Sequence, residues 1–143
     1  MKQHRPASPG PRKQTASHFG LHLTLDGYLC NPKTLGDMAH VSGALRELPE
    51  RLGMRRLIPP YAIEVASNNR KDPGGLSGFV IIQDSHISVR AFPARRFVSI
   101  DVYSCRNFNT RLAVAYFRRT FGIRKVETNL VVRGREYPER DFR

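Results

Sequence analysis

The chain has 143 residues and a mass of 16.3 kDa, which is the size of about one domain around a single core. It carries 24 Lys and Arg against 12 Asp and Glu, a formal net charge of +12, so a partner or substrate with anionic groups would suit it. Because the sequence has no run of eighteen apolar residues and no apolar stretch behind its basic N-terminus, we expect neither a membrane span nor a signal peptide, and a cytoplasmic protein.

The first seventeen residues are basic and rich in proline. Cations and prolines are interspersed there without an acidic residue: Lys2, Arg5, Pro6, Pro9, Pro11, Arg12 and Lys13. Such a segment cannot bury enough apolar surface to order itself. We therefore expect residues 1–17 to be a disordered tail rather than a specific nucleic-acid arm, and residues 18–143 to be the folded domain.

A strand and a helix are predicted first. Residues 18–28 alternate apolar and polar side chains, which is the period of a strand buried on one face. Thr34 followed by Asp37 resembles a capping box, and apolar residues then recur at intervals of three or four from Leu35 to Leu52. This pattern predicts one amphipathic helix that ends at Gly53.

The middle of the chain predicts strands joined by short links. Residues 57–65 favour an edge strand because Pro59 and Pro60 cannot donate to a sheet ladder, and residues 68–75 predict a turn. Three β-rich runs follow, at residues 76–83, 86–92 and 97–103. Links this short favour antiparallel neighbours.

A second helix and a last strand complete the domain. Asn109 or Thr110 can cap a helix that Gly122 closes, and residues 126–133 predict a strand. Strands grouped between two helices predict an α+β fold, a two-layer sandwich of a mainly antiparallel sheet with two helices on one face.

The candidate chemistry lies at Asp84-Ser85-His86, where polar residues interrupt two apolar strands. For an arbitrary Ser-His pair such as Ser85-His86, the ordinary interpretation is that both residues lie in a hairpin turn. Cys30 and Cys105 are too few for a disulfide framework, so free thiols are expected and either could take part in chemistry.

Three segments of the chain resemble the signature of the bacterial and archaeal S-adenosylmethionine decarboxylases. In that family Gly-Val-Ser-Gly precedes Glu-Ser-His-(Ile/Leu)-Ser-Ile-His-Thr-Trp-Pro-Glu, and Asp-Val-Phe-Thr-Cys-Gly follows. Here Ser77 lies eight residues before Ser85 and Cys105 lies twenty residues after it, without a gap against the family spacing. The N-terminal part is similar too, at Gly20, His22, Asp26, Cys30, Leu35 and Asp37.

The resemblance implies a proenzyme that cuts itself between Asp84 and Ser85. The Ser85 hydroxyl would attack the Asp84 carbonyl to form an ester, and elimination and hydrolysis would leave a pyruvoyl group derived from Ser85. Its ketone would form a Schiff base with a substrate amine and accept the electrons left by carbon dioxide, so we expect no other cofactor and no metal. Cys105 would be the proton donor, and Ser77 would assist processing.

The family histidine that promotes elimination is replaced by Arg90. Arginine stays protonated and is a poor base, although it can stabilise an oxyanion. Self-processing with Arg90 in this position is therefore an open question. Other histidines could supply the base, and the candidates are His22, His40 and His86.

The substrate contacts of the family are also altered. Lys71 aligns with the aromatic residue that stacks on adenine, and Ala94 aligns with the glutamate that holds the ribose hydroxyls, whereas Phe92 keeps an aromatic ring in the position of the tryptophan. Phe92 and Asp26 are the candidate substrate-binding residues. Adenosylmethionine and a basic amino acid, ornithine or arginine, both remain candidate substrates.

The resulting hypothesis is a pyruvoyl-dependent decarboxylase of polyamine biosynthesis, which the resemblance implies to be a homodimer with sites near its interface. One alternative, motivated by Arg90, is an unprocessed homologue that regulates an active partner. The other is a basic nucleic-acid-binding domain that uses the tail and the pairs Arg95-Arg96 and Arg118-Arg119. Because such pairs are more often solvated surface, nucleic acid is the less expected partner.

Overall fold

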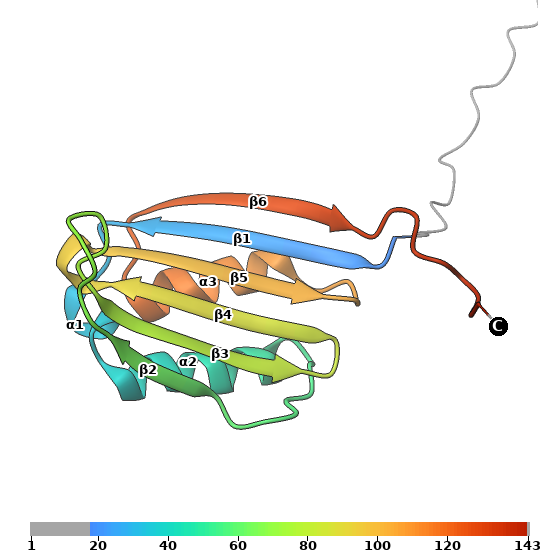
Figure 1. Ribbon diagram of the computed structural model, residues 1–143, viewed down its shortest axis with the longest axis horizontal. Helices are drawn as coiled ribbons and strands as arrows, with labels where there is room; N and C mark the ends of the chain where they lie inside the picture. The colour runs from blue at the N-terminus through green and yellow to red at the C-terminus, as the bar shows by residue number, and fades with distance from the viewer. Residues whose placement is uncertain (1–17, 143) are drawn as a thin grey trace, which may run out of the picture.

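A six-stranded antiparallel sheet forms the body of the computed structural model, which describes residues 18–142 (Figure 1). The strands lie in the order β2-β3-β4-β5-β1-β6. The elements are β1 (Gly20–Tyr28), α1 (Pro32–Leu35), α2 (Met38–Arg51), β2 (Tyr61–Val65), β3 (Gly75–Ile82), β4 (Ser85–Phe92), the 3-10 helix η1 (Pro93–Arg95), β5 (Phe97–Ser104), α3 (Thr110–Phe121) and β6 (Lys125–Arg133). The expected disordered tail, residues 1–17, lies outside the described residues. Among the helices of the described residues, none has the length and apolar composition of a membrane span.

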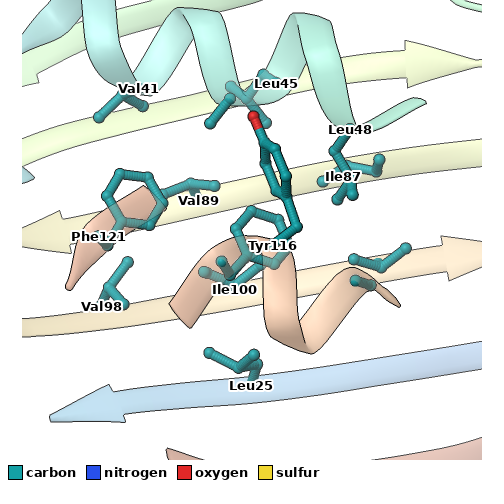
Figure 2. Packing of buried hydrophobic residues seen from close by; sticks show 14 of the residues in the cluster. Leu25, Val41, Leu45, Leu48, Ile87, Val89, Val98, Ile100, Tyr116 and Phe121 are labelled. Carbon is teal, nitrogen blue, oxygen red and sulfur yellow. The ribbon is translucent and has the colours of Figure 1, made fainter. Parts of the chain in front are cut away.

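The helices cover one face of the sheet, and the core lies between the two layers (Figure 2). Alternation along β4 and β5 turns every second side chain toward the helices, and those of Ile87, Val89, Val98 and Ile100 are fully buried there. Each such burial stabilises the fold by about 1.5–3 kcal/mol. The predicted α+β two-layer sandwich is confirmed.

The prediction of one helix from residue 34 to residue 52 is wrong in one respect, because the chain forms two helices there. Asn31 caps α1 by accepting a hydrogen bond from the Lys33 N–H. Asp37 has an extended backbone and caps α2 by accepting from Ala39 and His40. Asp37 is thus the N-cap of the second helix, not the third residue of a capping box on Thr34.

The other predicted elements are confirmed to within a few residues. β2 is an edge strand and begins at Tyr61, after the two prolines. β4 begins at Ser85 rather than at His86, so that the turn between β3 and β4 consists of Gln83 and Asp84. The ordinary interpretation of this segment, a tight hairpin, therefore describes its backbone correctly.

The opposite face of the sheet carries no helix and is mixed in character. On β2 and β3 it presents a patch of exposed apolar side chains: Tyr61, Ile63, Phe79 and Ile81. On the inner strands of the same face, the His22 Nε2 lies 2.8 Å from Asp101 Oδ1, and Ser88 donates to Asp101 Oδ2 at 3.3 Å. The polar network is ordinary for a sheet face in water, whereas a cluster of exposed apolar side chains is a candidate interaction surface.

Tyr116 of α3 joins the two long helices. Its hydroxyl donates to Glu47 Oε2 of α2 at 2.9 Å, and Figure 2 shows its ring reaching toward α2 near Leu45. Burial first, and then the hydrogen bond to Glu47, raises the pKa of Tyr116 from its ordinary value of 10.0 to about 12. The folded protein therefore holds this phenol neutral at a pH where the unfolded chain ionises it.

The Tyr116→Phe variant should be less stable than the parent by about 1 kcal/mol near neutral pH, because it lacks the hydrogen bond to Glu47. Because the pKa of Tyr116 is raised in the folded state, the parent has its full stability advantage below pH 10. It loses this advantage as the pH rises through about 12. Urea unfolding of both proteins at pH 7 and near pH 11 measures the difference. Tyr61→Phe, at an exposed position of β2, is the control for the ionisation of tyrosine in general. If the stability difference between the parent and Tyr116→Phe is the same at both pH values, the raised pKa of Tyr116 is contradicted.

Candidate active site

The expected cleavage point lies in a strained turn. Ser85 pairs with Ile82 across the two-residue turn of the β3–β4 hairpin, at the right-hand end of the sheet in Figure 1. The φ angle of Ser85 is 153°, a region that is populated almost only by glycine and costs about 1–3 kcal/mol for other residues. The residue on the C-terminal side of the Asp84–Ser85 peptide bond therefore has a strained backbone.

The carbonyl group of Asp84 is held by a main-chain donor from the next strand. The backbone N–H of Cys105, just past the end of β5, donates to Asp84 O at 2.8 Å. A donor in this position can stabilise the negative charge that develops on the oxygen when a nucleophile attacks the carbonyl carbon. Sequence reasoning missed this group, because a main-chain amide has no signature in a sequence.

The hydroxyl group of Ser85 contacts an imidazole. Ser85 Oγ lies 3.2 Å from Nδ1 of His86, and the His86 ring packs edge-on against Tyr103 with 5.6 Å between centroids. The residue pair lies at the surface. The other two candidate bases lie elsewhere, since His22 bonds to Asp101 and His40 to the Thr120 carbonyl.

The side chains of Asp84, Cys105 and Arg106 form a small polar cluster beside the turn. Cys105 Sγ lies 3.8 Å from Asp84 Oδ1, and Arg106 Nε lies 3.5 Å from Asp84 Oδ2. Arg106 was not predicted as a site residue, although its position directly after Cys105 could have suggested a cation near the turn. The cluster places an exposed thiol within a few ångströms of the expected cleavage point.

The second cysteine has a different environment. Cys30 is 1% exposed, and burial raises the pKa of its thiol to about 11. A buried, protonated thiol is unreactive. Of the two cysteines, Cys105 is therefore the one whose exposure and position suit chemistry.

Ser77 and Arg90 are neighbours of each other but not of Ser85. They are register partners on β3 and β4, and Arg90 lies five residues beyond Ser85 along β4, about 17 Å at about 3.3 Å per residue. The Arg90 guanidinium is held by Asp72, with 2.9 Å between Nη2 and Oδ1, and stacks 4.3 Å from the centre of the Phe92 ring. Within one chain, neither Ser77 nor Arg90 reaches the cleavage point, and their roles in processing stay predictions.

A pocket of about 590 Å³ lies beside the link from β4 to β5, at the opposite end of β4 from Ser85. Its lining combines aromatic rings with polar and charged groups: Tyr28, Asn68, Asn69, Lys71, Asp72, Phe92, Arg95 and Phe97. Phe92, a candidate substrate-binding residue, and Lys71, which replaces the family's adenine-stacking aromatic residue, therefore lie in one cavity. Asp26 lies on β1, paired in register with Ser99 of β5.

Comparisons with known proteins identify the family of the chain. The family model described as S-adenosylmethionine decarboxylase matches residues 21–134. The chain is 29% identical over 119 residues to an S-adenosylmethionine decarboxylase proenzyme of Clostridium botulinum, covering 82% of the chain and 97% of the relative. It is 28% identical over 125 residues to the proenzyme of Pyrococcus horikoshii, covering 87% and 85%.

A solved structure shares the fold. The crystal structure of the adenosylmethionine decarboxylase from Aquifex aeolicus superposes with a TM-score of 0.71 at 19% identity, covering 88% of this chain and 98% of that one. The family model spans most of the described residues, including the hairpin with Ser85 and the strand that leads to Cys105. The chain belongs to the S-adenosylmethionine decarboxylase family.

Proposed function

We propose that the chain is a proenzyme that cuts itself between Asp84 and Ser85 and then decarboxylates S-adenosylmethionine for polyamine biosynthesis in the cytoplasm. The observation that carries the proposal is the Asp84 carbonyl, which accepts a hydrogen bond from the Cys105 N–H directly before a strained Ser85. A peptide group that is strained and already polarised is prepared for attack by the adjacent hydroxyl. The similarity to curated proenzymes supports the same conclusion.

The site fits a pyruvoyl group at position 85. Ser85 is partly exposed, so that a small molecule can approach it, and the exposed Cys105 thiol lies beside the same turn. When formed, a pyruvoyl group supplies the electron sink that decarboxylation of an amino acid requires. Cys105 Sγ would deliver the proton that replaces the carboxyl group on the substrate carbon.

We propose adenosylmethionine as the substrate rather than ornithine or arginine. The similar proenzymes carry that substrate in their names. The pocket offers the rings of Tyr28, Phe92 and Phe97 to a flat base, whereas Lys71 and Arg95 would repel the cationic side chain of a basic amino acid. Adenosylmethionine also carries a positive charge, on its sulfonium sulfur, but its adenine and ribose are uncharged and can lie beside these cations and against the rings.

We propose that the working form is a homodimer that pairs the helix-free faces of two sheets. This face carries the apolar patch of Tyr61, Ile63, Phe79 and Ile81, which a second copy would remove from water. In one chain, Ser85 and the aromatic pocket lie at opposite ends of β4. Two sheets stacked with opposed strand directions would bring the Ser85 of one copy near the Ser77, Arg90 and pocket of the other.

Intact-mass spectrometry of the purified full chain tests the proposal. Cleavage predicts two fragments that divide between Asp84 and Ser85, the second lacking a free N-terminal amine. A chain that stays whole after prolonged incubation contradicts the proposal and favours the unprocessed regulator that Arg90 suggests.

The substrate is tested on the cleaved protein. Incubation with adenosylmethionine, ornithine or arginine, followed by reduction with cyanoborohydride, should add mass to the second fragment only with adenosylmethionine. An adduct formed with ornithine or arginine instead would retain the pyruvoyl chemistry and overturn the substrate.

A further inference from the structure

We propose that His86 is the catalytic base that activates the Ser85 hydroxyl for self-cleavage. The proposal rests on the proposed function, because it concerns how the same peptide bond is cut. The contact that carries it joins Ser85 Oγ and His86 Nδ1 at 3.2 Å. A serine hydroxyl is a weak nucleophile until an adjacent base accepts its proton.

The surroundings of His86 suit this role. Its ring is supported by the edge-on contact with Tyr103, while the residue itself is exposed. A neutral imidazole that carries its proton on Nε2 presents the lone pair of Nδ1 to the hydroxyl, and its exposed position lets solvent exchange the proton afterwards. Ser85, His86 and the Cys105 N–H thus place nucleophile, base and oxyanion donor around one carbonyl group.

The other basic candidates are occupied elsewhere. Arg90 is held by Asp72 at the far end of the hairpin. His22 lies in the network with Asp101, and His40 bonds to the Thr120 carbonyl at 2.6 Å. In the part of the chain that the structure describes, His86 is the histidine that contacts the reacting hydroxyl.

The step balances in atoms and charge. The Ser85 Oγ–H proton moves to His86 Nδ1 as Oγ bonds to the carbonyl carbon of Asp84, and the resulting oxyanion accepts the hydrogen bond from the Cys105 N–H. When the oxyanion collapses, the bond from that carbon to the Ser85 nitrogen breaks, and the proton held by His86 passes to the nitrogen as it leaves. The products are an ester between Asp84 and the Ser85 side chain and a free amine on Ser85, with no oxidant or metal involved.

Cleavage kinetics of histidine variants test the proposal. Radiolabelled full chains made by cell-free translation are followed from synthesis, for the parent, His86→Ala, His86→Asn and the control His40→Ala. We expect the cleavage rate of His86→Ala and of His86→Asn to fall about 10²–10⁴-fold, although asparagine can keep a hydrogen bond to Ser85. Added imidazole should restore part of the rate in His86→Ala, and His40→Ala should cut at the parental rate.

Hydroxylamine identifies the step at which His86 acts, because it cleaves an ester but not a peptide bond. If His86 activates Ser85, the His86→Ala chain forms little ester and hydroxylamine does not accelerate its cleavage. If hydroxylamine cuts His86→Ala rapidly, the ester forms without His86 and the proposal is overturned.

The outcomes separate this proposal from the function on which it rests. A parent chain that never cleaves contradicts the proposed function. A parent that cleaves together with a His86→Asn variant that cleaves equally fast leaves the function standing and overturns the role of His86. His86→Asn keeps the comparison decisive if His86→Ala fails to fold, and circular dichroism reports the folded state of each variant.

Discussion

The Ser85→Ala variant is expected to remain one uncut chain and to have no decarboxylase activity. Alanine has no hydroxyl to attack the Asp84 carbonyl, so neither the ester nor the pyruvoyl group can form. The Cys105 N–H to Asp84 O hydrogen bond is made by main-chain atoms and should persist in the variant. Intact-mass spectrometry and release of labelled carbon dioxide from adenosylmethionine measure the two losses.

A matched control lies on the same strand. Ser88 donates to Asp101 rather than to a group at the turn, so Ser88→Ala should still be cut. Cleavage of Ser85→Ala at the same bond would show that the Ser85 hydroxyl is not the nucleophile.

The strain at Ser85 can be measured in the same set of proteins. Glycine adopts a φ of 153° without the steric cost that alanine meets. Uncut Ser85→Gly should therefore be more stable than uncut Ser85→Ala by about 1–2 kcal/mol in urea unfolding, the reverse of the usual order within a strand.

The Cys105→Ala variant is expected to cut itself but to turn over substrate about 10²–10⁴-fold more slowly. The substitution removes the thiol that lies beside the turn while keeping the backbone N–H that bonds the Asp84 carbonyl. Processing and turnover should therefore separate. Carbon dioxide release is measured per cleaved chain, so that incomplete processing cannot imitate a loss of activity.

Cys30→Ala is the control for loss of a thiol. Cys30 is buried in the core, so its substitution should lower stability while turnover per cleaved chain stays near the parental value. If Cys105→Ala and the parent turn over substrate at the same rate per cleaved chain, Cys105 is not the proton donor.

The sequence determined the architecture and the family with few errors. Alternation of apolar residues predicts which side chains of the strands face the core, because successive side chains of a strand point to opposite faces. The spacing of Ser77, Ser85 and Cys105 carried the resemblance that the family model bears out. The break between α1 and α2 was missed, because the apolar spacing continues through the residue that caps the second helix.

Only the tertiary structure decided which of these residues meet. Strand pairing brings Cys105 beside Asp84, although twenty residues separate them, and it carries Arg90 to the far end of the hairpin, although only four residues lie between it and Ser85. The reason is physical: distance along a strand grows by about 3.3 Å per residue, whereas neighbouring strands lie about 4.8 Å apart whatever their separation in sequence. The contact of His86 with Ser85 and the strained backbone at Ser85 are also features that no residue pattern specifies.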